Sequence, residues 1–250
     1  KNQRILPWRT SVKNNLPNPY NVMISEFMLQ QTTVNSVISK FNQFIQIWPN
    51  LNKLSAANEN EILQFWSGLG YYNRAKNLFK SAKIIKAKYN SIIPDNYDEL
   101  IKLPGIGDYT AKAILGIGFN QNLMPVDANI ERILARLYGL KEPVILIKKK
   151  IFSLAESYIS KKQSSNLIQA FMDYGSIICL PRNPKCNVCK IKNECVAYEK
   201  NLIHIIPNKK KSTNTKQKKY TRAYIIINHS NEILVRRRSP NGMLPSMIEI

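Results

Sequence analysis

The four cysteines constrain this chain more than any other feature, because all of them lie within one segment of 17 residues. Their spacing is C-x6-C-x2-C-x5-C, at Cys179, Cys186, Cys189 and Cys195. A disulfide scaffold would staple distant parts of a fold, so this clustering indicates a metal or cluster site in a reducing compartment. Four thiolates can supply one ligand to each iron of a [4Fe–4S] cubane, which is the expected cofactor. A zinc knuckle is the alternative, although structural zinc usually takes two close cysteine pairs and this segment has one.

The charge balance indicates a polyanionic partner. The 250 residues, enough for one large or two ordinary domains, hold 37 Lys and Arg against 16 Asp and Glu, a formal net charge of +21. Nucleic acid or an anionic membrane surface fits this excess, and a general lysine bias explains part of it. No apolar run approaches the roughly 20 residues of a membrane span, and no signal-peptide pattern is found, so no membrane-spanning segment is expected. Nucleic acid is the expected partner, and a membrane is not.

Residues 1–205 are predicted to be mainly α-helical. Helical periodicity interrupted by short Gly, Pro and Asn signals predicts helices at 20–47, 59–66, 73–89, 97–102, 108–118, 128–138, 147–160 and 164–178. The lysine-rich segment 206–221 has the composition of a linker. After it, AYIIIN, HSNE and ILVRRR predict a β-hairpin, so a second, mixed or β domain begins near 222 and is incomplete at 250.

The stretch SEFMLQQT, residues 25–32, places polar groups on a helix that is apolar further along. If one helix runs through 20–47, Gln30 and Gln31 lie on its apolar stripe and Glu26 lies at the flank. A carboxyl beside an apolar face has its neutral form favoured by desolvation, as a general acid requires.

Two further motifs combine the start of a helix with polar groups. In LPGIGDYTAKAIL, residues 103–115, Gly105 and Gly107 allow backbone N–H groups to point outward, and Lys112 follows nearby. This pattern favours phosphate binding, with a purely structural turn as the alternative. In VDANIERILARL, residues 126–137, Asp127 precedes the buried stripe of a helix. It is an ordinary N-cap, a carboxylate that stabilises positive charge in a pocket, or both.

The stretch FWSGLGYYNRAKNL, residues 65–78, combines a glycine turn with two tyrosines and basic residues. Aromatic side chains that project from a tight turn beside cations suit a wedge between bases. Core packing is the alternative and is expected for Tyr71 or Trp66. Arg74 is predicted to contact DNA, with simple solvation as the alternative.

These motifs occur in the same order as in the helix-hairpin-helix DNA glycosylases. SEFMLQQT, GLGYYNRAKNL, LPGIGDYTAKAI, VDANIERIL and the four-cysteine segment resemble the iron–sulfur branch of that superfamily, and within it the MutY family of adenine DNA glycosylases. The resemblance covers residues 1–205 and implies a two-lobed fold with a helix-hairpin-helix at about 97–118 and an iron–sulfur loop at 179–195. The tail from 222 resembles the start of that family's Nudix-like α/β domain, which recognises 8-oxoguanine.

The resemblance implies a division of catalytic work between two carboxyl groups. Glu26 matches the acid that protonates adenine as its glycosidic bond breaks, and Asp127 matches the carboxylate that stabilises the oxocarbenium-like sugar. Asn129 matches a residue that helps to order the site. Tyr109 stands where related lyases carry a lysine that forms a Schiff base, so lyase activity is not expected; it matches instead a tyrosine lining the pocket.

The resemblance also implies DNA contacts. Gln30, Gln31 and Tyr72 match residues that fill or wedge the duplex once adenine is flipped out, and Arg4 corresponds to a basic residue at the pocket entrance. One position departs from the family, which usually has glycine where this chain has Ala128. Alanine would cost about 1 kcal/mol and displace Asp127 if the position requires a positive φ, but it is harmless in the first turn of a helix.

The expected function is base-excision repair, in which a monomer hydrolytically removes adenine opposite 8-oxoguanine or guanine in double-stranded DNA. A thymine–guanine mismatch or pyrimidine-lesion glycosylase of the same superfamily is one alternative, and a non-catalytic iron–sulfur DNA-binding protein is another. A bacterial cytoplasmic location, at the nucleoid, is expected. Because the chain begins in mid-motif and stops abruptly at MIEI, it is expected to be a fragment, which leaves an organellar targeting segment open.

Overall fold

The computed structural model describes residues 4–13, 16–159, 163–208, 220, 222–239 and 248–250, which belong to two compact units, residues 1–210 and 211–250. In the first unit the described α-helices are α1 (Pro19–Leu29), α2 (Val34–Ile47), α3 (Leu51–Ala56), α4 (Glu59–Phe65), α5 (Asn73–Tyr89), α6 (Tyr97–Leu100), α7 (Asp108–Ala113), α8 (Ala128–Leu137), α9 (Lys148–Ser157), α10 (Ser164–Ile177) and α11 (Val196–Glu199). Short elements are β1 (Ser11–Lys13), β2 (Leu16–Pro17), the 3-10 turns η1 (Pro7–Arg9), η3 (Val144–Leu146), η4 (Cys186–Val188) and η5 (Lys192–Glu194), and the π-helical turn η2 (Ile114–Gly118). The predicted mainly helical fold is confirmed.

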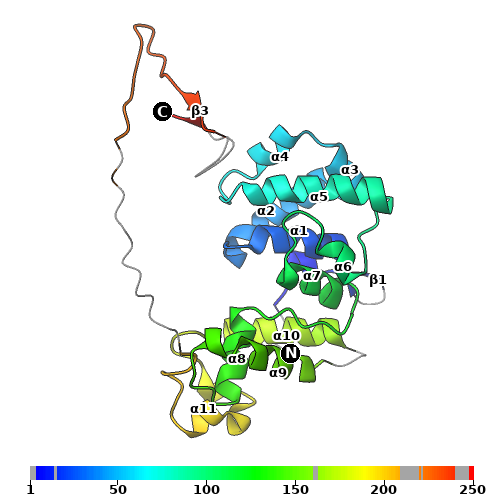
Figure 1. Ribbon diagram of the computed structural model, residues 1–250, viewed down its shortest axis with the longest axis vertical. Helices are drawn as coiled ribbons and strands as arrows, with labels where there is room; N and C mark the ends of the chain where they lie inside the picture. The colour runs from blue at the N-terminus through cyan, green and yellow to red at the C-terminus, as the bar shows by residue number, and fades with distance from the viewer. Residues whose placement is uncertain (1–3, 14–15, 160–162, 209–219, 221, 240–247) are drawn as a thin grey trace. The chain divides into compact units, whose positions relative to one another are not determined.

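Helices α1–α7 form one group in the first unit, drawn above helices α8–α11 in Figure 1. Helix α1 is the central member, in contact with α2, α5, α7 and η2. Because it is enclosed on several sides, its apolar residues Met23, Ile24, Phe27 and Met28 are fully buried. Glu26 is carried by the same helix, so its carboxyl enters the interior of the unit.

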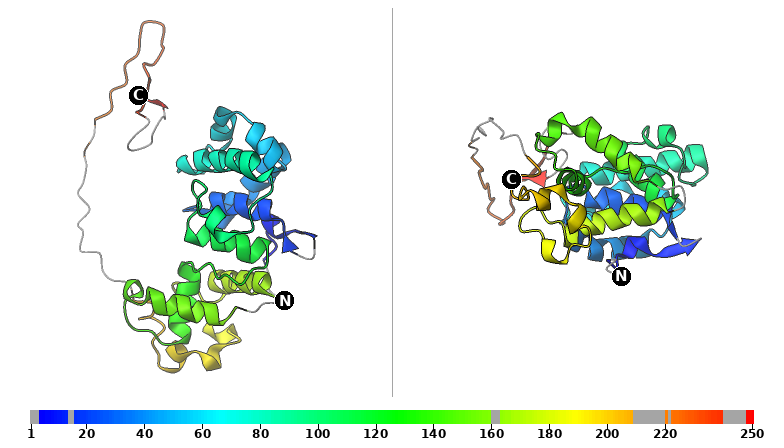
Figure 2. Two further views of the ribbon diagram at one scale, coloured as in Figure 1. Left: turned by 45° about the vertical axis from the view of Figure 1, so that its right-hand side comes forward. Right: turned by 90° about the horizontal axis from the view of Figure 1, so that it is seen from below.

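Helices α8–α11 form the second group and pack on the first mainly through α10 and η2. The Ser165 hydroxyl of α10 donates to the Ile117 carbonyl of η2 at 2.8 Å. Figure 2 shows the two groups as separate layers, with the cysteine segment, in yellow, on the side away from α1–α7.

The helix predicted over 20–47 is divided in two by a turn at residues 30–33. Gln31 has a φ of 57°, in the left-handed region that ends an α-helix. Thr33 then caps α2 by accepting a hydrogen bond from the Ser36 N–H at 3.4 Å. The expectation that Gln30 and Gln31 lie on a helical stripe is therefore wrong. Gln30 is the C-cap of α1, and Gln31 lies in the exposed turn that follows. The structure also adds the short helix α3, which the pattern did not predict.

The helical unit extends just beyond the predicted boundary at residue 205. Ile206 is 1% exposed, and its carbonyl accepts a hydrogen bond from Arg136 Nε at 2.8 Å. The Asn208 carbonyl accepts one from the Val144 N–H at 3.2 Å. The start of the predicted linker thus packs with the helices, and the rest of it, apart from residue 220, lies outside the described residues.

In the second unit, Ile227 and Ile233 pair in antiparallel fashion across a turn. The Asn228 side chain accepts hydrogen bonds from two backbone N–H groups of that turn, at 2.9 Å each. Strand β3 (Arg236–Arg237) pairs with β4 (Ile248–Glu249). The predicted hairpin is present in this form. No helix in the part of the chain that the structure describes is long and apolar enough to cross a membrane.

Candidate active site

Residues predicted from separate motifs meet at one cavity of about 380 Å³, lined by both helix groups. The lining includes Ser25, Glu26, Leu29 and Gln30 of α1 and its end, Tyr109 of α7, Asp127 and Asn129 at the start of α8, Met172 and Ser176 of α10, and Arg4, Trp8 and Arg9 of the N-terminal segment. A larger cavity of about 970 Å³ shares Asn129, but Glu131 is the one carboxylate among the described residues that line it. The smaller cavity is therefore the one equipped for acid–base chemistry with two carboxyl groups.

Glu26 is a buried carboxyl, 7% exposed. Burial raises its pKa, and the charge of Asp127 raises it further, while Arg9 and a hydrogen bond from Tyr109 act in the opposite direction; the result is about 7. Burial also raises the pKa of Tyr109 well above its ordinary value, so the phenol keeps its proton and donates a hydrogen bond to Glu26. A carboxyl group whose pKa lies near neutral pH can deliver a proton to a bound base and take one back.

Asp127 is the N-cap of α8. Its Oδ1 accepts hydrogen bonds from the Asn129 N–H at 2.9 Å and the Ile130 N–H at 2.8 Å, and its Oδ2 accepts one from Asn129 Nδ2 at 2.8 Å. The carboxylate is thus fixed by three donors at the positive end of a helix. Ala128 is the first residue of α8 with ordinary helical backbone, so alanine in place of the family glycine is harmless here.

Arg132 connects the Asp127 cap to the cysteine segment. Its guanidinium is buried and donates to the Asn129 side-chain oxygen at 2.9 Å, the Gly175 carbonyl at 2.6 Å and the Cys179 carbonyl at 2.7 Å. Burial lowers its pKa, because the guanidinium is removed from water. Asn129, which orients Asp127, is therefore itself held by a residue that reaches the first cysteine.

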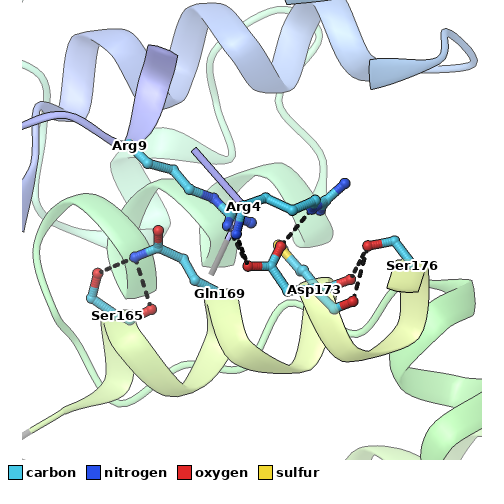
Figure 3. A network of polar contacts seen from close by, with 7 residues as sticks. Arg4, Arg9, Ser165, Gln169, Asp173 and Ser176 are labelled. Atoms are coloured by element: carbon cyan, nitrogen blue, oxygen red, sulfur yellow. Dashed lines mark hydrogen bonds and ion pairs between the residues drawn. The ribbon is translucent and has the colours of Figure 1, made fainter. Parts of the chain in front are cut away.

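Asp173 of α10 binds both arginines of the N-terminal segment that line the cavity, as Figure 3 shows. Arg4 Nε lies 2.6 Å from Asp173 Oδ1, and Arg9 Nη1 lies 2.8 Å from Oδ2. Burial alone would raise the pKa of Asp173, but the hydrogen bonds from Arg9 and Arg4 outweigh it and lower the pKa. The carboxylate therefore anchors Arg9 close enough to influence Glu26 electrostatically.

Asp173, Arg9 and Trp8 were not singled out from the sequence. Asp173 lies in a helix beside apolar residues. An acidic residue in such a place is typical of a buried carboxylate that has a charged partner, and this pattern could have identified it. Arg9 and Trp8 follow Arg4 in the same short segment, and only the contact with α10 shows that this segment lines the cavity. Arg4, which was predicted at the pocket entrance, does line it.

The glycine turn lies beside Gln30 near the cavity. Gln30 Nε2 donates to the Gly105 carbonyl at 3.3 Å. Gly105 has a φ of 79°, and a Cβ there would lie 2.8 Å from both Asn77 Cβ and Phe27 Cε1, so only glycine fits. A Cβ at Gly107, the N-cap of α7, would meet nothing within 4 Å, so this position is not crowded by the rest of the protein.

Three residues that were predicted to contact DNA are paired or buried within the protein. Lys112 already pairs with Asp108 at 2.9 Å, and its side chain is 18% exposed. Arg74 is 6% exposed and donates to carbonyls of its own unit, so the prediction that it contacts DNA does not hold. Tyr72 is partly buried against the hydrophobic core, whereas Tyr71 is 60% exposed, the reverse of the expected order.

The four cysteines form no disulfide and line one small cavity beside α8 and α10. Arg136 Nη1 donates to Cys179 Sγ at 3.4 Å, and the Tyr174 hydroxyl lies 2.9 Å from Cys189 Sγ. Within the described ranges, no three His, Cys, Asp or Glu side chains are already gathered around a single metal position. A set of four thiols around one small space, beside the guanidinium of Arg136, fits a [4Fe–4S] cluster.

Comparisons with known proteins identify the same kind of protein, a DNA glycosylase. The family model described as HhH-GPD superfamily base excision DNA repair protein matches residues 24–157. The adenine DNA glycosylase of Buchnera aphidicola subsp. Baizongia pistaciae is 41% identical over 242 residues, which are 96% of this chain and 67% of that protein. A thermostable thymine-DNA glycosylase has a TM-score of 0.71 at 30% identity, over 79% of this chain and 89% of that one. An endonuclease III in a non-covalent complex with DNA has a TM-score of 0.62 at 26% identity, over 74% and 86%.

The chain spans about two thirds of the length of the curated relatives it matches first. The residues matched by the family model include Glu26, Tyr109 and Asp127, three of the groups that line the cavity. The chain therefore belongs to the HhH-GPD superfamily of base excision DNA repair proteins and, within it, to the family of adenine DNA glycosylases.

Proposed function

We propose that the chain removes adenine from double-stranded DNA in which adenine is mispaired with 8-oxoguanine or guanine, by hydrolysis and without lyase activity. The observation that carries this proposal is the pair of unlike carboxyl groups at one cavity. Glu26 is buried with a pKa of about 7, and the Asp127 side chain is held in place by three hydrogen-bond donors. Glycosidic cleavage needs this combination of an acid and a charge-stabilising carboxylate.

In the proposed reaction, adenine leaves the base stack and enters the cavity. The bond between base and sugar breaks, the base keeps the electron pair, and the Glu26 carboxyl supplies the proton that makes adenine a neutral leaving group. Asp127 stabilises the positive charge on the sugar. Water then adds to the sugar carbon, and the proton that it loses returns to Glu26.

Tyr109 is the reason why we propose hydrolysis without strand cleavage. A lyase needs an amine that forms a Schiff base with the opened sugar, and a phenol cannot form one. Lys112, the nearest lysine on the same helical segment, is held by Asp108. Tyr109 instead donates its hydrogen bond to Glu26, which keeps the acid oriented toward the cavity.

DNA would be held by groups around the cavity. The uncrowded position of Gly107 leaves room for a phosphate, and the turn that carries Gln30 and Gln31 suits contact with the opened duplex. The net charge of +21 supplies the long-range attraction. Residues 222–250 are proposed as the beginning of a Nudix-like domain that contributes to recognition of the opposite base, and the active species is proposed to be a monomer.

Cys179, Cys186, Cys189 and Cys195 would hold a [4Fe–4S] cluster. When bound, the cluster would link the four cysteine side chains and so restrict the loop beside α8. Arg132 and Arg136 hold the backbone of this segment through carbonyls at Cys179 and Leu180.

The proposal is tested by single-turnover assays on duplexes with one adenine opposite 8-oxoguanine or guanine. Free adenine should be released while the strand stays intact, and borohydride should trap no covalent complex. A thymine–guanine duplex is included because a thymine-DNA glycosylase is among the similar structures. Release of thymine but not adenine, or a borohydride-trapped adduct, would replace the proposal with one of these sibling activities.

A further inference from the structure

Tyr174 of α10 is attached to the cysteine segment at two points. Its backbone carbonyl accepts a hydrogen bond from the Cys179 N–H at 2.8 Å. Its side-chain hydroxyl lies 2.9 Å from Cys189 Sγ, within hydrogen-bond distance. This one residue therefore reaches the first and the third of the four cysteines, and its hydroxyl touches a sulfur directly.

The direction of the hydroxyl contact follows from the chemistry of the proposed ligands. In the free thiol, either the oxygen or the sulfur can be the donor. A cysteine that binds iron does so as a thiolate, which has no proton to give. With the cluster bound, the Tyr174 hydroxyl is therefore the donor and Cys189 Sγ is the acceptor.

Cys189 differs from the other cysteines in the kind of group that its sulfur meets. Arg136 Nη1 donates to Cys179 Sγ at 3.4 Å, but the same guanidinium also holds two backbone carbonyls of the segment. Cys195 Sγ lies 3.5 Å from a backbone carbonyl, that of Arg136. Within the described residues, the Tyr174 hydroxyl is the one uncharged side-chain donor at a cysteine sulfur. Its effect on the sulfur can therefore be removed without removing a charge.

The neighbours of Tyr174 on α10 serve the candidate active site. Asp173 binds both arginines of the N-terminal segment, and the Gly175 carbonyl accepts a hydrogen bond from Arg132 at 2.6 Å. The Tyr174 hydroxyl takes part in neither contact. Removing it leaves the groups around the cavity in place.

Hydrogen bonds to the sulfurs are one of the factors that set the reduction potential of an iron–sulfur cluster. Reduction by one electron makes the cluster and its thiolates more negative, and a donor stabilises the more negative state more strongly. We propose that Tyr174 is a positioning residue whose hydroxyl raises the reduction potential of the bound cluster through its hydrogen bond to Cys189. This inference rests on the proposed [4Fe–4S] cofactor and assigns one residue of this chain to its tuning.

The test compares Tyr174→Phe with the unsubstituted chain, both purified with the cluster bound. Phenylalanine keeps the ring and the backbone carbonyl that binds Cys179, and it removes only the hydroxyl. In a redox titration followed by visible absorbance and EPR, the midpoint potential of the variant should be lower. At the midpoint potential of the unsubstituted chain, its ratio of oxidised to reduced cluster should be about 3 to 10 instead of 1, a shift of about 30 to 60 mV for one electron.

Tyr198→Phe is the matched control. Tyr198 lines the same small cavity as the cysteines, and in the described part of the chain no hydrogen bond joins its hydroxyl to a cysteine sulfur. Its midpoint potential should equal that of the unsubstituted chain. If Tyr174→Phe loses its cluster during purification, 3-fluorotyrosine in place of Tyr174 supplies the test. Fluorine makes the hydroxyl a stronger donor, so this replacement should raise the midpoint potential.

A purely structural role for the hydroxyl predicts a lower Tm or faster loss of iron in Tyr174→Phe at an unchanged midpoint potential, and that result would overturn the inference. An equal fall in Tyr198→Phe would also overturn it, because the effect would then belong to any hydroxyl beside the cysteines. Failure of the proposed cofactor is recognised separately, since the unsubstituted chain would then contain zinc or no metal and would lack visible absorbance. Adenine release, assayed in parallel, reports on the proposed activity independently of the potential.

Discussion

The carboxylate of Asp127 raises the pKa of Glu26, although the two residues come from different helix groups and lie far apart in the sequence. Burial is the larger cause, and together they hold the pKa of Glu26 at about 7. Asp127 itself is surrounded by three hydrogen-bond donors. The pKa of one carboxyl group is thus held near neutral pH, while the other carboxyl group is held in place by hydrogen-bond donors.

The first prediction concerns pH. The rate of base release should fall as the pH rises through about 7, because Glu26 must be protonated to act and loses its proton there. Asp127→Asn removes one of the causes of the raised pKa, so the descending limb of its residual activity should move to lower pH. Single-turnover rates across neutral pH measure both effects. A rate that is flat through neutrality would show that the proton of Glu26 is not used.

The second prediction concerns Arg132. Arg132→Gln leaves the carbonyls of Gly175 and Cys179 without their donor, at a cost of about 1–3 kcal/mol for each buried group left unpaired. We expect a lower free energy of unfolding, faster loss of the visible absorbance of the cluster, and slower base release because Asn129 loses its support. Arg182→Gln, in the exposed part of the same segment, should change the stability by less than about 0.5 kcal/mol. Equal behaviour of the two variants would contradict the assigned link.

The third prediction separates two roles for Arg74. Because its N–H groups bind buried carbonyls of two turns, Arg74→Lys should lower the free energy of unfolding by about 2–4 kcal/mol, since one ammonium cannot span both turns. Arg74→Gln, which removes the charge, should leave the salt dependence of DNA binding unchanged. A direct phosphate contact would instead make the salt slope of Arg74→Gln smaller by about one, with little effect on stability. Lys80→Ala, on an exposed position of the same helix, is the stability control.

The fourth prediction uses the two glycines of one turn as matched sites. Gly105→Ala should destabilise the fold by about 1–3 kcal/mol, because the position has a positive φ and the methyl group would meet Asn77 and Phe27. Gly107→Ala has room for its methyl group and an ordinary φ of −95°. It should keep the Tm and weaken DNA binding, because the methyl group obstructs the approach of a phosphate. Loss of affinity without loss of stability at Gly105 would reverse this assignment.

Short-range patterns predicted the helices and the residues at their ends, because caps and periodicity are local. The stretch around Asp127 is an example, since its N-cap role was evident from the stripe that follows it. The break after Gln30 was missed because an apolar period continues on both sides of it. Only the φ of Gln31 and the cap at Thr33 divide the helix.

Long-range partners could not be predicted in the same way. Arg74 and Asp173 are both charged residues in helices, and a helical pattern does not reveal what lies opposite them. Arg74 is buried because carbonyls from two turns replace its water, and Asp173 is buried because two arginines pair with it. The exposure of Tyr71 likewise depends on Arg74 rather than on its own sequence neighbours.

The most direct test of the central claim is single-turnover release of adenine by Glu26→Gln near pH 7. Glutamine keeps the shape of the side chain but cannot donate the catalytic proton, so the rate should fall by about 10²- to 10⁴-fold. The variant should fold at least as well above neutral pH, because an acid whose pKa is raised on folding destabilises the protein once it ionises. Release of adenine by a folded Glu26→Gln at the rate of the unsubstituted chain would contradict the account.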